Sequence, residues 1–347
     1  MSKALHLQSM EINCSPLETQ LFKKIGAAAD KLGVPAYLIG GFVRDKIIGR
    51  PTTDVDVVCI GDGIALAHEV AALFSPKPTV AFFKTFGTAQ IKIDDFIIEF
   101  VGARKESYAS DSRKPSVSPG SIEDDQNRRD FTINALAIGL HEAAFGKLVD
   151  PFGGLQAIQD KIIKTPLAPH QTFSDDPLRM LRGIRFACQL GYTIVPETLD
   201  AIADSAHRIS IISQERITEE LNKIMLCDKP SVGFDLLFKV GLLHKIFPQL
   251  VDLYGAENID GMGHKDNFYH TLQVLDNMAE STPDLWLRWA ALLHDIAKPA
   301  TKKFEEGFGS KRMHRLNFEF FLEICGLAQY CIWSVFERES WTIGFVL

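Results

Sequence analysis

Two aspartates separated by one valine, in the stretch DVDVVC at residues 54–59, constrain the fold of this chain more than any other feature. The apolar residues around them predict a β-strand, in which Asp54 and Asp56 share one face about 6.6 Å apart while the valines enter a core. Carboxylates this close repel each other unless water solvates them or a cation lies between them. The pair therefore predicts either a half-exposed strand or a site for Mg²⁺, which binds one or two carboxylates together with substrate phosphates.

Strand and helix patterns alternate in the first half of the chain, whereas the second half reads as helical. Apolar runs predict strands in PAYLIG, DVDVVCI, AQIKI and FIIEFVG, and helices near residues 19–32 and 64–74. From about residue 175, apolar residues recur every three or four positions. We therefore expect an α/β head followed by an all-α neck and body, divided as 1–150 head, 151–230 neck, 231–308 body and 309–347 atypical tail.

Two further segments carry local predictions. Residues 104–127 are rich in serine, proline and charge without periodicity, which predicts a long mobile loop, and such loops are usually functional. The following NRRDFTINALA, residues 127–137, predicts a helix because Asp130 suits an N-cap and apolar residues follow at helical spacings.

Composition excludes several classes of protein. A 46% share of hydrophobic residues is ordinary for a globular chain, and no apolar run is long enough to span a bilayer or resembles a secretory signal, so we expect a cytoplasmic protein without membrane contact. The six cysteines show no metal-ligand spacing. A net charge of −7 disfavours a nonspecific nucleic-acid binder, although a local basic face can still hold RNA.

The segment LIGGFVRD, residues 38–45, lies just upstream of the aspartates. A strand followed by Gly40 and Gly41 at the start of a helix presents backbone N–H groups that suit a phosphate, and Arg44 adds a cation one turn later. A pair of glycines alone means little. The order of GG, an arginine and then D-x-D is much more specific.

In this combination the chain resembles the class II tRNA nucleotidyltransferase (CCA-adding enzyme) and bacterial poly(A) polymerase family, within the polymerase β-like nucleotidyltransferases. The resemblance implies a mixed sheet with flanking helices in the head. It also implies that Asp54 and Asp56 hold Mg²⁺ ions that activate an RNA 3′-hydroxyl and stabilise the leaving pyrophosphate. Glu99, in FIIEFVG, is the candidate for a third catalytic carboxylate, although a solvent-facing acid would look the same.

The family's second motif, R-R-D-F-T-x-N-A, is matched by residues 128–135. By resemblance Arg129, with Arg128, contacts the nucleotide phosphates, because the planar guanidinium meets phosphate in a bidentate manner. As structure alone, both arginines could equally be solvated side chains on a capped helix.

The stretch SDDPLRMLRGIRFACQL, residues 174–190, predicts a helix on which Asp176 and Arg179 share a face that Arg182 and Arg185 continue. An acceptor beside a donor complements a base edge that offers an amine next to a ring nitrogen, as cytosine and adenine do. The plain alternative is an ordinary ion pair. By resemblance these residues bind the nucleotide base, although Asp175 stands where the family has glutamate.

A second set of possible metal ligands lies downstream. His270, with the adjacent His294 and Asp295, resembles the start of an HD-type phosphohydrolase site. That superfamily requires a further distant aspartate, and Asp295 is the last aspartate in the chain, while His314 could supply another ligand. We therefore expect a structural remnant rather than an active hydrolase.

Taken together, these motifs predict an enzyme that adds C and A residues from CTP and ATP to the 3′ end of tRNA and releases pyrophosphate. The alternatives are a poly(A) polymerase, an enzyme adding only CC or only A, and an HD-type metal-dependent phosphohydrolase. The resemblance fades after about Glu306, and the aromatic-rich tail that follows is expected to reflect truncation or a shifted reading frame.

Overall fold

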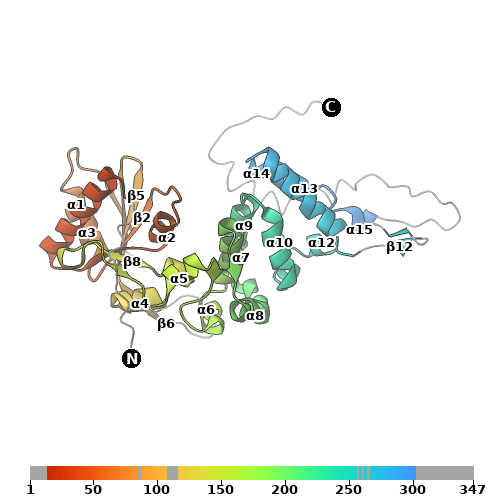
Figure 1. Ribbon diagram of the computed structural model, residues 1–347, viewed down its shortest axis with the longest axis horizontal. Coiled ribbons are helices and arrows are strands. Elements are labelled where there is room, and N and C mark those ends of the chain that lie inside the picture. The colour runs from red at the N-terminus through yellow and green to blue at the C-terminus, as the bar shows by residue number, and fades with distance from the viewer. Residues whose placement is uncertain are drawn as a thin grey trace. The chain divides into compact units, whose positions relative to one another are not determined.

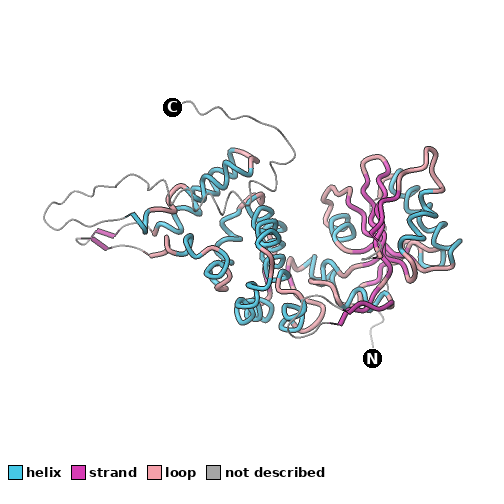
Figure 2. Tube along the Cα trace, turned by 180° about the vertical axis from the view of Figure 1, so that it is seen from behind, coloured by secondary structure: helices cyan, strands magenta, loops and turns pink. Residues whose placement is uncertain are grey.

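A computed structural model describes residues 14–83, 87–107, 116–255, 258–259, 262–263 and 266–301 of the chain. It divides into two compact units, residues 1–179 with 192–201 and residues 180–191 with 202–347. The first unit holds the main β-sheet with its helices, and the second is mainly helical (Figures 1 and 2). The expected α/β head and helical remainder are thus confirmed, whereas the finer division into head, neck and body stays a prediction.

A seven-stranded mixed sheet forms the centre of the first unit (Figure 1). Neighbouring strands are antiparallel except β2 and β5, which run parallel. In spatial order the strands are β3 (Val80–Phe83), β4 (Thr88–Ile93), β5 (Phe96–Gly102), β2 (Asp54–Cys59), β1 (Ala36–Ile39), β8 (Ala137–Gly139) and β9 (Leu148–Val149). The strands predicted from apolar runs are therefore confirmed, with β2 at the middle of the sheet.

The alternation predicted for β2 is observed: Val55 and Val57 are each 1% exposed, whereas Asp54 is exposed and Asp56 is partly buried. Helix α3 (Gly63–Ala71) packs on β4 and β5 and against α1 (Pro16–Leu32), and the short α2 (Gly41–Ile47) packs on β1 and β2. Burial of each large apolar side chain in this core contributes roughly 1.5–3 kcal/mol. The core thereby fixes the backbone that carries the two aspartates.

Outside the large sheet, the first unit has smaller elements. The remaining helices and strands are β6 (Arg104–Ser107), β7 (Ser116–Pro119), α4 (Ile122–Asn127), η1 (Thr132–Asn134), η2 (Glu142–Ala144), α5 (Gly154–Gln159), β10 (Ile162–Ile163), α6 (Pro169–Asp175), the start of α7 (Leu178–Leu190), β11 (Thr193–Ile194) and most of α8 (Pro196–Ser205).

The second unit is built from amphipathic helices. Its elements after α7 and α8 are η3 (Ala206–Ile211), α9 (Gln214–Met225), α10 (Pro230–Lys239), α11 (Leu243–Ile246), α12 (Pro248–Val251), β12 (Asn258–Ile259), β13 (Met262–Gly263), α13 (Asn267–Ser281), α14 (Leu285–Leu293) and α15 (Lys298–Thr301). Buried Arg288 of α14 donates hydrogen bonds to the carbonyls of Met225 and Cys227, which joins α14 to the end of α9.

Two local predictions are wrong. The stretch 104–127 contains the hairpin β6–β7 and helix α4 instead of being one long loop, although residues 108–115 lie outside the described residues. The helix predicted at 127–137 is not formed: a 3₁₀ turn, η1, leads into β8, which pairs with β1. Asp130 accepts hydrogen bonds from the Phe131 N–H and from Asn134 Nδ2, so its side chain stabilises a turn and not a helix start.

Candidate active site

Three carboxylates meet on one face of the sheet where β2 and β5 run side by side. Asp54 and Asp56 project from the same face of β2, and Asp56 is the register partner of Glu99 on β5. Paired positions on neighbouring strands lie about 4.8 Å apart, so Asp56 and Glu99 lie side by side on the sheet. The third carboxylate expected from the sequence therefore lies beside the first two.

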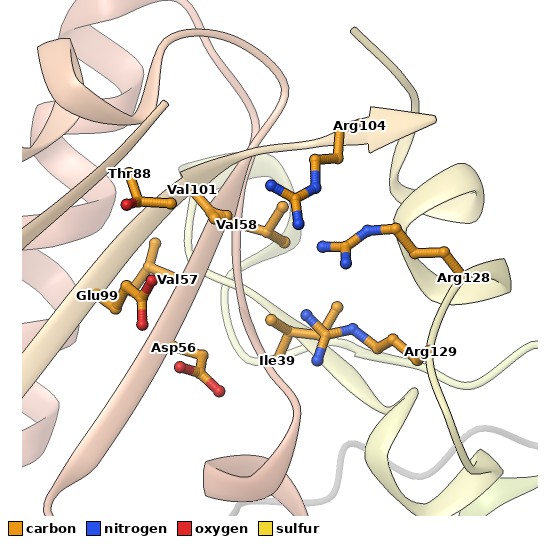
Figure 3. A pocket seen from close by; sticks show the side chains of 10 residues that line it. All are labelled: Ile39, Asp56, Val57, Val58, Thr88, Glu99, Val101, Arg104, Arg128 and Arg129. Carbon is orange, nitrogen blue, oxygen red and sulfur yellow. The ribbon is translucent and has the colours of Figure 1, made fainter. Parts of the chain in front are cut away.

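A pocket of about 200 Å³ opens beside these acids. Figure 3 shows Asp56 and Glu99 on one side of it, with the guanidinium groups of Arg104, Arg128 and Arg129 on the other side. The remaining lining residues are Ile39, Val57, Val58, Thr88 and Val101. The pocket thus has an acidic half and a cationic half.

The electrostatics of Asp56 show how crowded the acidic half is. Burial, together with the charges of Glu99, Asp54 and Asp125, raises the pKa of Asp56 to about 6, although Arg129 acts in the opposite direction. Burial is the largest cause of this shift, and the neighbouring carboxylates add to it. Hard oxygen donors in that arrangement fit a divalent cation, which would remove the penalty for ionising Asp56.

Gly40, the residue before α2, lies between the two halves of the pocket. Its φ of 80° is in the left-handed region. A Cβ placed on it would come within 2.8 Å of Nη1 of Arg129 and 3.0 Å of a carboxylate oxygen of Asp56. Gly40 therefore lets the backbone pass between an arginine and a carboxylate of the site, whereas a Cβ on Gly41 would have only an ordinary contact with Arg44.

Arg44 is 5% exposed and lies beside the turn that follows Arg129 in the chain. It donates from Nε and Nη2 to the two carboxylate oxygens of Asp45 and from Nη1 to Asn134 Oδ1 at 2.6 Å. These contacts join α2 to η1. The described contacts of Arg44 are with other protein groups, so its predicted role in binding the nucleotide is not tested by them.

Arg128 and Arg129 follow directly after α4 and both pair with buried Asp125 of that helix. Arg129 donates from Nε and Nη2 to one carboxylate oxygen at 3.1 and 3.0 Å, and Arg128 donates to the other from Nε at 2.9 Å and from Nη2. Both arginines line the pocket, and their phosphate-binding role stays a prediction.

The proposed base-reading residues lie at the junction of α6 and α7. Asp176 is not inside a helix: its backbone is extended, and its carboxylate accepts a hydrogen bond from the N–H of Leu178. Pro177 explains the break, because proline disfavours a helical conformation at the residue before it. Arg179, buried in the first turn of α7, donates to the backbone carbonyl of Arg128 at 2.5 Å and to that of Thr172 at 3.4 Å.

The arginines further along α7 have protein partners in the second unit. Arg185 is 9% exposed and forms an ion pair of 2.7 Å with buried Glu220 of α9. Its guanidinium also lies 4.0 Å from the ring centroid of Phe186, and that of Arg182 lies 5.4 Å from the same ring. Their nucleotide-binding role stays a prediction, and the contacts of Arg185 link α7 to α9.

The second candidate metal site lies in the helical unit. The structure brings together the side chains of His270, His294 and Asp295. Each offers one possible ligand atom, and these three atoms lie within 4.8 Å of one another. Asp295 also pairs with Lys298 at 2.5 Å and with Nε2 of His294 at 3.1 Å. His314 lies outside the described residues. The ammonium of Lys298 already supplies a positive charge to the only carboxylate of this triplet.

Sequence reasoning missed Arg104 and Asp125. Arg104 follows β5 closely and lines the pocket opposite the carboxylates. Asp125 precedes Arg128 and Arg129 by three and four residues, a spacing at which helical side chains meet. That spacing was a usable signal in the sequence, whereas the position of Arg104 depends on how the hairpin β6–β7 leaves the sheet.

Three family models match the chain in order. The poly(A) polymerase head domain matches residues 36–164, the probable RNA and SrmB-binding site of polymerase A matches 191–253, and the HD domain matches 267–329. The chain therefore resembles proteins that carry a poly(A) polymerase head domain. The head-domain match includes the glycines, the aspartates and the arginine pair of the pocket, so the family resemblance predicted from these motifs is confirmed. Members of this nucleotidyltransferase family use divalent metal ions, which agrees with the carboxylate cluster.

Curated proteins similar to this chain include A-adding and CCA-adding enzymes. The chain is 39% identical over 60% of its length to an A-adding tRNA nucleotidyltransferase of Halalkalibacterium halodurans, covering 48% of that protein. It is 36% identical over 72% of its length to a CCA-adding enzyme of Geobacillus sp., covering 61% of that protein. The chain therefore spans about half to three fifths of the length of these relatives.

A solved structure of similar fold is a tRNA nucleotidyltransferase complexed with a primer tRNA and an incoming ATP analog. It matches with a TM-score of 0.63 and 29% identity over 78% of this chain and 75% of that one. Among the described residues of this chain, no helix is long and apolar enough to cross a membrane.

The backbone position of Gly40 generates a first prediction. Gly40→Ala forces a Cβ against Arg129 and Asp56, so we expect nucleotide incorporation to fall at least about 100-fold, as for loss of a well-placed charged group. Gly33→Ala is the matched control, because Gly33 has a similar φ of 67° but open space around its Cβ position. Steady-state rates of both variants test this, and equal losses in the two would contradict it.

The raised pKa of Asp56 generates a second prediction, for the metal-free protein. An acid whose pKa is raised on folding destabilises the native state once it ionises, so this penalty is absent at low pH and complete above about pH 6. Asp56→Asn should therefore raise the free energy of unfolding at pH 7.5 by about 1–2 kcal/mol. Near pH 4 the gain should vanish.

Denaturant titrations with EDTA present measure this gain at both pH values. Asp95→Asn is a control, since Asp95 lies exposed in the turn between β4 and β5. An Asp56→Asn variant less stable than the wild type at pH 7.5 would contradict the view that burial and neighbouring carboxylates penalise ionised Asp56.

Proposed function

We propose that the chain is a Mg²⁺-dependent nucleotidyltransferase that adds C and A residues from CTP and ATP to the 3′ end of tRNA, with release of pyrophosphate. The observation that carries this proposal is the pocket itself, with carboxylates facing arginines across a gap. A nucleoside triphosphate with bound metal ions needs carboxylates to hold the metal and arginines to hold the phosphates. The names of the relatives agree with tRNA as the substrate class.

In this proposal Asp54, Asp56 and Glu99 hold the metal ions. When bound, the metal ions lower the pKa of the attacking 3′-hydroxyl and neutralise charge on the leaving pyrophosphate. Asp54 does not line the described pocket and is exposed at the start of β2, so it supports the cluster from its solvent side. The raised pKa of Asp56 is consistent with a site that becomes fully ionised only when a cation is present.

The arginines hold the triphosphate. Arg128 and Arg129 take the role predicted from the sequence, and Arg104 joins them as a third guanidinium on the same side of the pocket. A pocket of about 200 Å³ is smaller than the roughly 300–1,000 Å³ of pockets that enclose a whole drug-sized ligand. It therefore suits the phosphates and metal, and the base extends beyond it.

The base is read by Asp176 and Arg179 in this proposal. Asp176 accepts from the exocyclic amine of cytosine or adenine, and Arg179 donates to the neighbouring ring nitrogen. Guanine and uracil present the reverse order of donor and acceptor, so GTP and UTP are rejected. The contact from Arg179 to the backbone carbonyl of Arg128 supports this reading, because it joins the base reader to the phosphate-binding segment.

The finer division of the chain follows from these roles. Residues 1–150 form a catalytic head, residues 151–230 a neck that reads the base, and residues 231–308 a body that carries the HD-like cluster. In the body, His270, His294 and Asp295 support a second candidate function, metal-dependent phosphoester hydrolysis. The ion pair of Asp295 with Lys298 disfavours it, since the lysine competes with a metal for the same carboxylate oxygen.

Incubation with tRNA lacking its last three nucleotides tests the function. CTP and ATP are supplied separately and together, and product lengths are read on sequencing gels. We expect three added residues when both are present. A second substrate is tRNA that already ends in CC: addition of A to this substrate without any addition to the shortened tRNA would identify an A-adding enzyme. Only two added C residues would identify a CC-adding enzyme, and a long adenosine run a poly(A) polymerase.

Variants assign the activity to a site. Asp54→Ala should reduce incorporation at least about 1,000-fold, because a metal ligand is lost. Asp95→Ala and His294→Ala should leave it within about twofold of the wild type, as expected for groups outside the site. Loss of incorporation in His294→Ala, or retention in Asp54→Ala, would overturn the assignment of the chemistry to the head.

A further inference from the structure

We propose that Asp125 is the positioning residue that aims both phosphate-binding arginines, Arg128 and Arg129, into the pocket. This inference rests on the proposed function and adds a residue to it. Asp125 does not line the pocket, and its own side chain has 0% exposure, so it acts only through the two arginines.

The contacts of Asp125 are divided between the two arginines. Oδ1 accepts from Nε and Nη2 of Arg128, and Oδ2 accepts from Nε and Nη2 of Arg129. In each guanidinium the same edge, formed by Nε and Nη2, faces the carboxylate. The Nη1 end of each group is thereby turned in a defined direction, and Figure 3 shows both side chains reaching toward the pocket from the segment after α4.

Burial makes this arrangement rigid. An ionised carboxylate without water is strongly destabilising unless cations and hydrogen-bond donors surround it, so neither arginine can swing away without leaving part of the charge uncompensated. Long arginine side chains on a surface would otherwise lose considerable rotamer freedom when they meet a phosphate. Asp125 has already removed that freedom before the nucleotide arrives, which is pre-organisation of the binding site.

The charge balance of the group also fits anion binding. One carboxylate facing two guanidinium groups leaves a net positive charge on the side of the pocket opposite Asp56 and Glu99. Nη1 of Arg129 is further located by the backbone carbonyl of Asn134 at 3.5 Å and by its close approach to Gly40. The cationic half of the pocket is therefore fixed from two sides.

A purely structural role would give different results from a positioning role. If Asp125 only stabilised the turn after α4, its loss would lower the melting temperature but would leave the affinity of folded protein for nucleotide unchanged. If it aims the arginines, affinity for the phosphates must fall even in folded protein. The discrimination between bases, which depends on Asp176 and Arg179, should stay the same in both cases.

The test measures dissociation constants of MgATP and of magnesium pyrophosphate by isothermal titration calorimetry, in the absence of RNA. In Asp125→Asn one oxygen becomes an NH₂ group that faces arginine donors. We expect both constants to rise about tenfold or more, the range for loss of charge-assisted hydrogen bonds. The ratio of the constants for ATP and CTP should not change.

Asp124→Asn is the matched control. Asp124 is the neighbouring aspartate on α4, and its described contacts are with Ser121 at the start of that helix. The substitution makes the same change in charge and keeps an amide oxygen as acceptor, so MgATP binding should stay within about twofold, as for a site outside the binding contacts.

A double-mutant cycle identifies the route of the effect. In a background that carries both Arg128→Ala and Arg129→Ala, Asp125→Asn should weaken MgATP binding less than about threefold, because both arginines through which it acts are gone. An equal factor in both backgrounds, or unchanged dissociation constants in Asp125→Asn, would overturn the proposal.

If Asp125→Asn does not fold, Asp125→Glu takes its place. This variant keeps the negative charge but displaces both arginines by about one bond length. It should show the same loss of affinity, with a melting temperature closer to that of the wild type. Unchanged affinity in folded Asp125→Glu would also overturn the proposal. Because these measurements need no RNA, a wild-type protein that binds MgATP but does not extend tRNA would refute the proposed function without refuting the role of Asp125.

Discussion

Repulsion between carboxylates on β2 and β5 is the constraint on which the rest of the site depends. The parallel pairing of these strands places Asp56 opposite Glu99, and the alternation along β2 brings Asp54 to the same face. A buried core of valines, isoleucines and phenylalanines holds the strands in this register, so the acids cannot move apart. Burial together with the neighbouring carboxylates raises the pKa of Asp56, and a bound divalent cation would favour its ionised form.

The cationic half of the pocket is stabilised by different contacts. Two of its three arginines, Arg128 and Arg129, belong to a short segment after α4 and both pair with the buried carboxylate of Asp125. Arg129 also lies close to Gly40. The backbone carbonyl of Arg128 in turn accepts a hydrogen bond from Arg179. This hydrogen bond joins the segment that carries Arg128 and Arg129 to the first turn of α7.

The failures of sequence reasoning have identifiable physical causes. At residues 127–137 the pattern of apolar residues resembled a helix, but Asp130 hydrogen-bonds within the turn and residues 137–139 complete the sheet beside β1. Asp176 was assigned to a helix face, yet Pro177 ends α6 at that point and leaves Asp176 extended. At the first place local hydrogen bonds, and at the second a proline, prevented the helix that the spacing of apolar residues predicted. The spacing of apolar residues carries no information about either effect.

The sequence alone determined the α/β head with its helical continuation, the strand carrying Asp54 and Asp56, and the family, because short-range periodicity and motif spacing encode all of these. It also named Glu99, Arg128 and Arg129. Only the tertiary structure decided that these groups share one pocket, that Arg104 joins them, and that Asp125 lies buried between two arginines. The reason is that strand register and burial arise from contacts between residues far apart in the chain, and no local pattern records which distant residues will be neighbours.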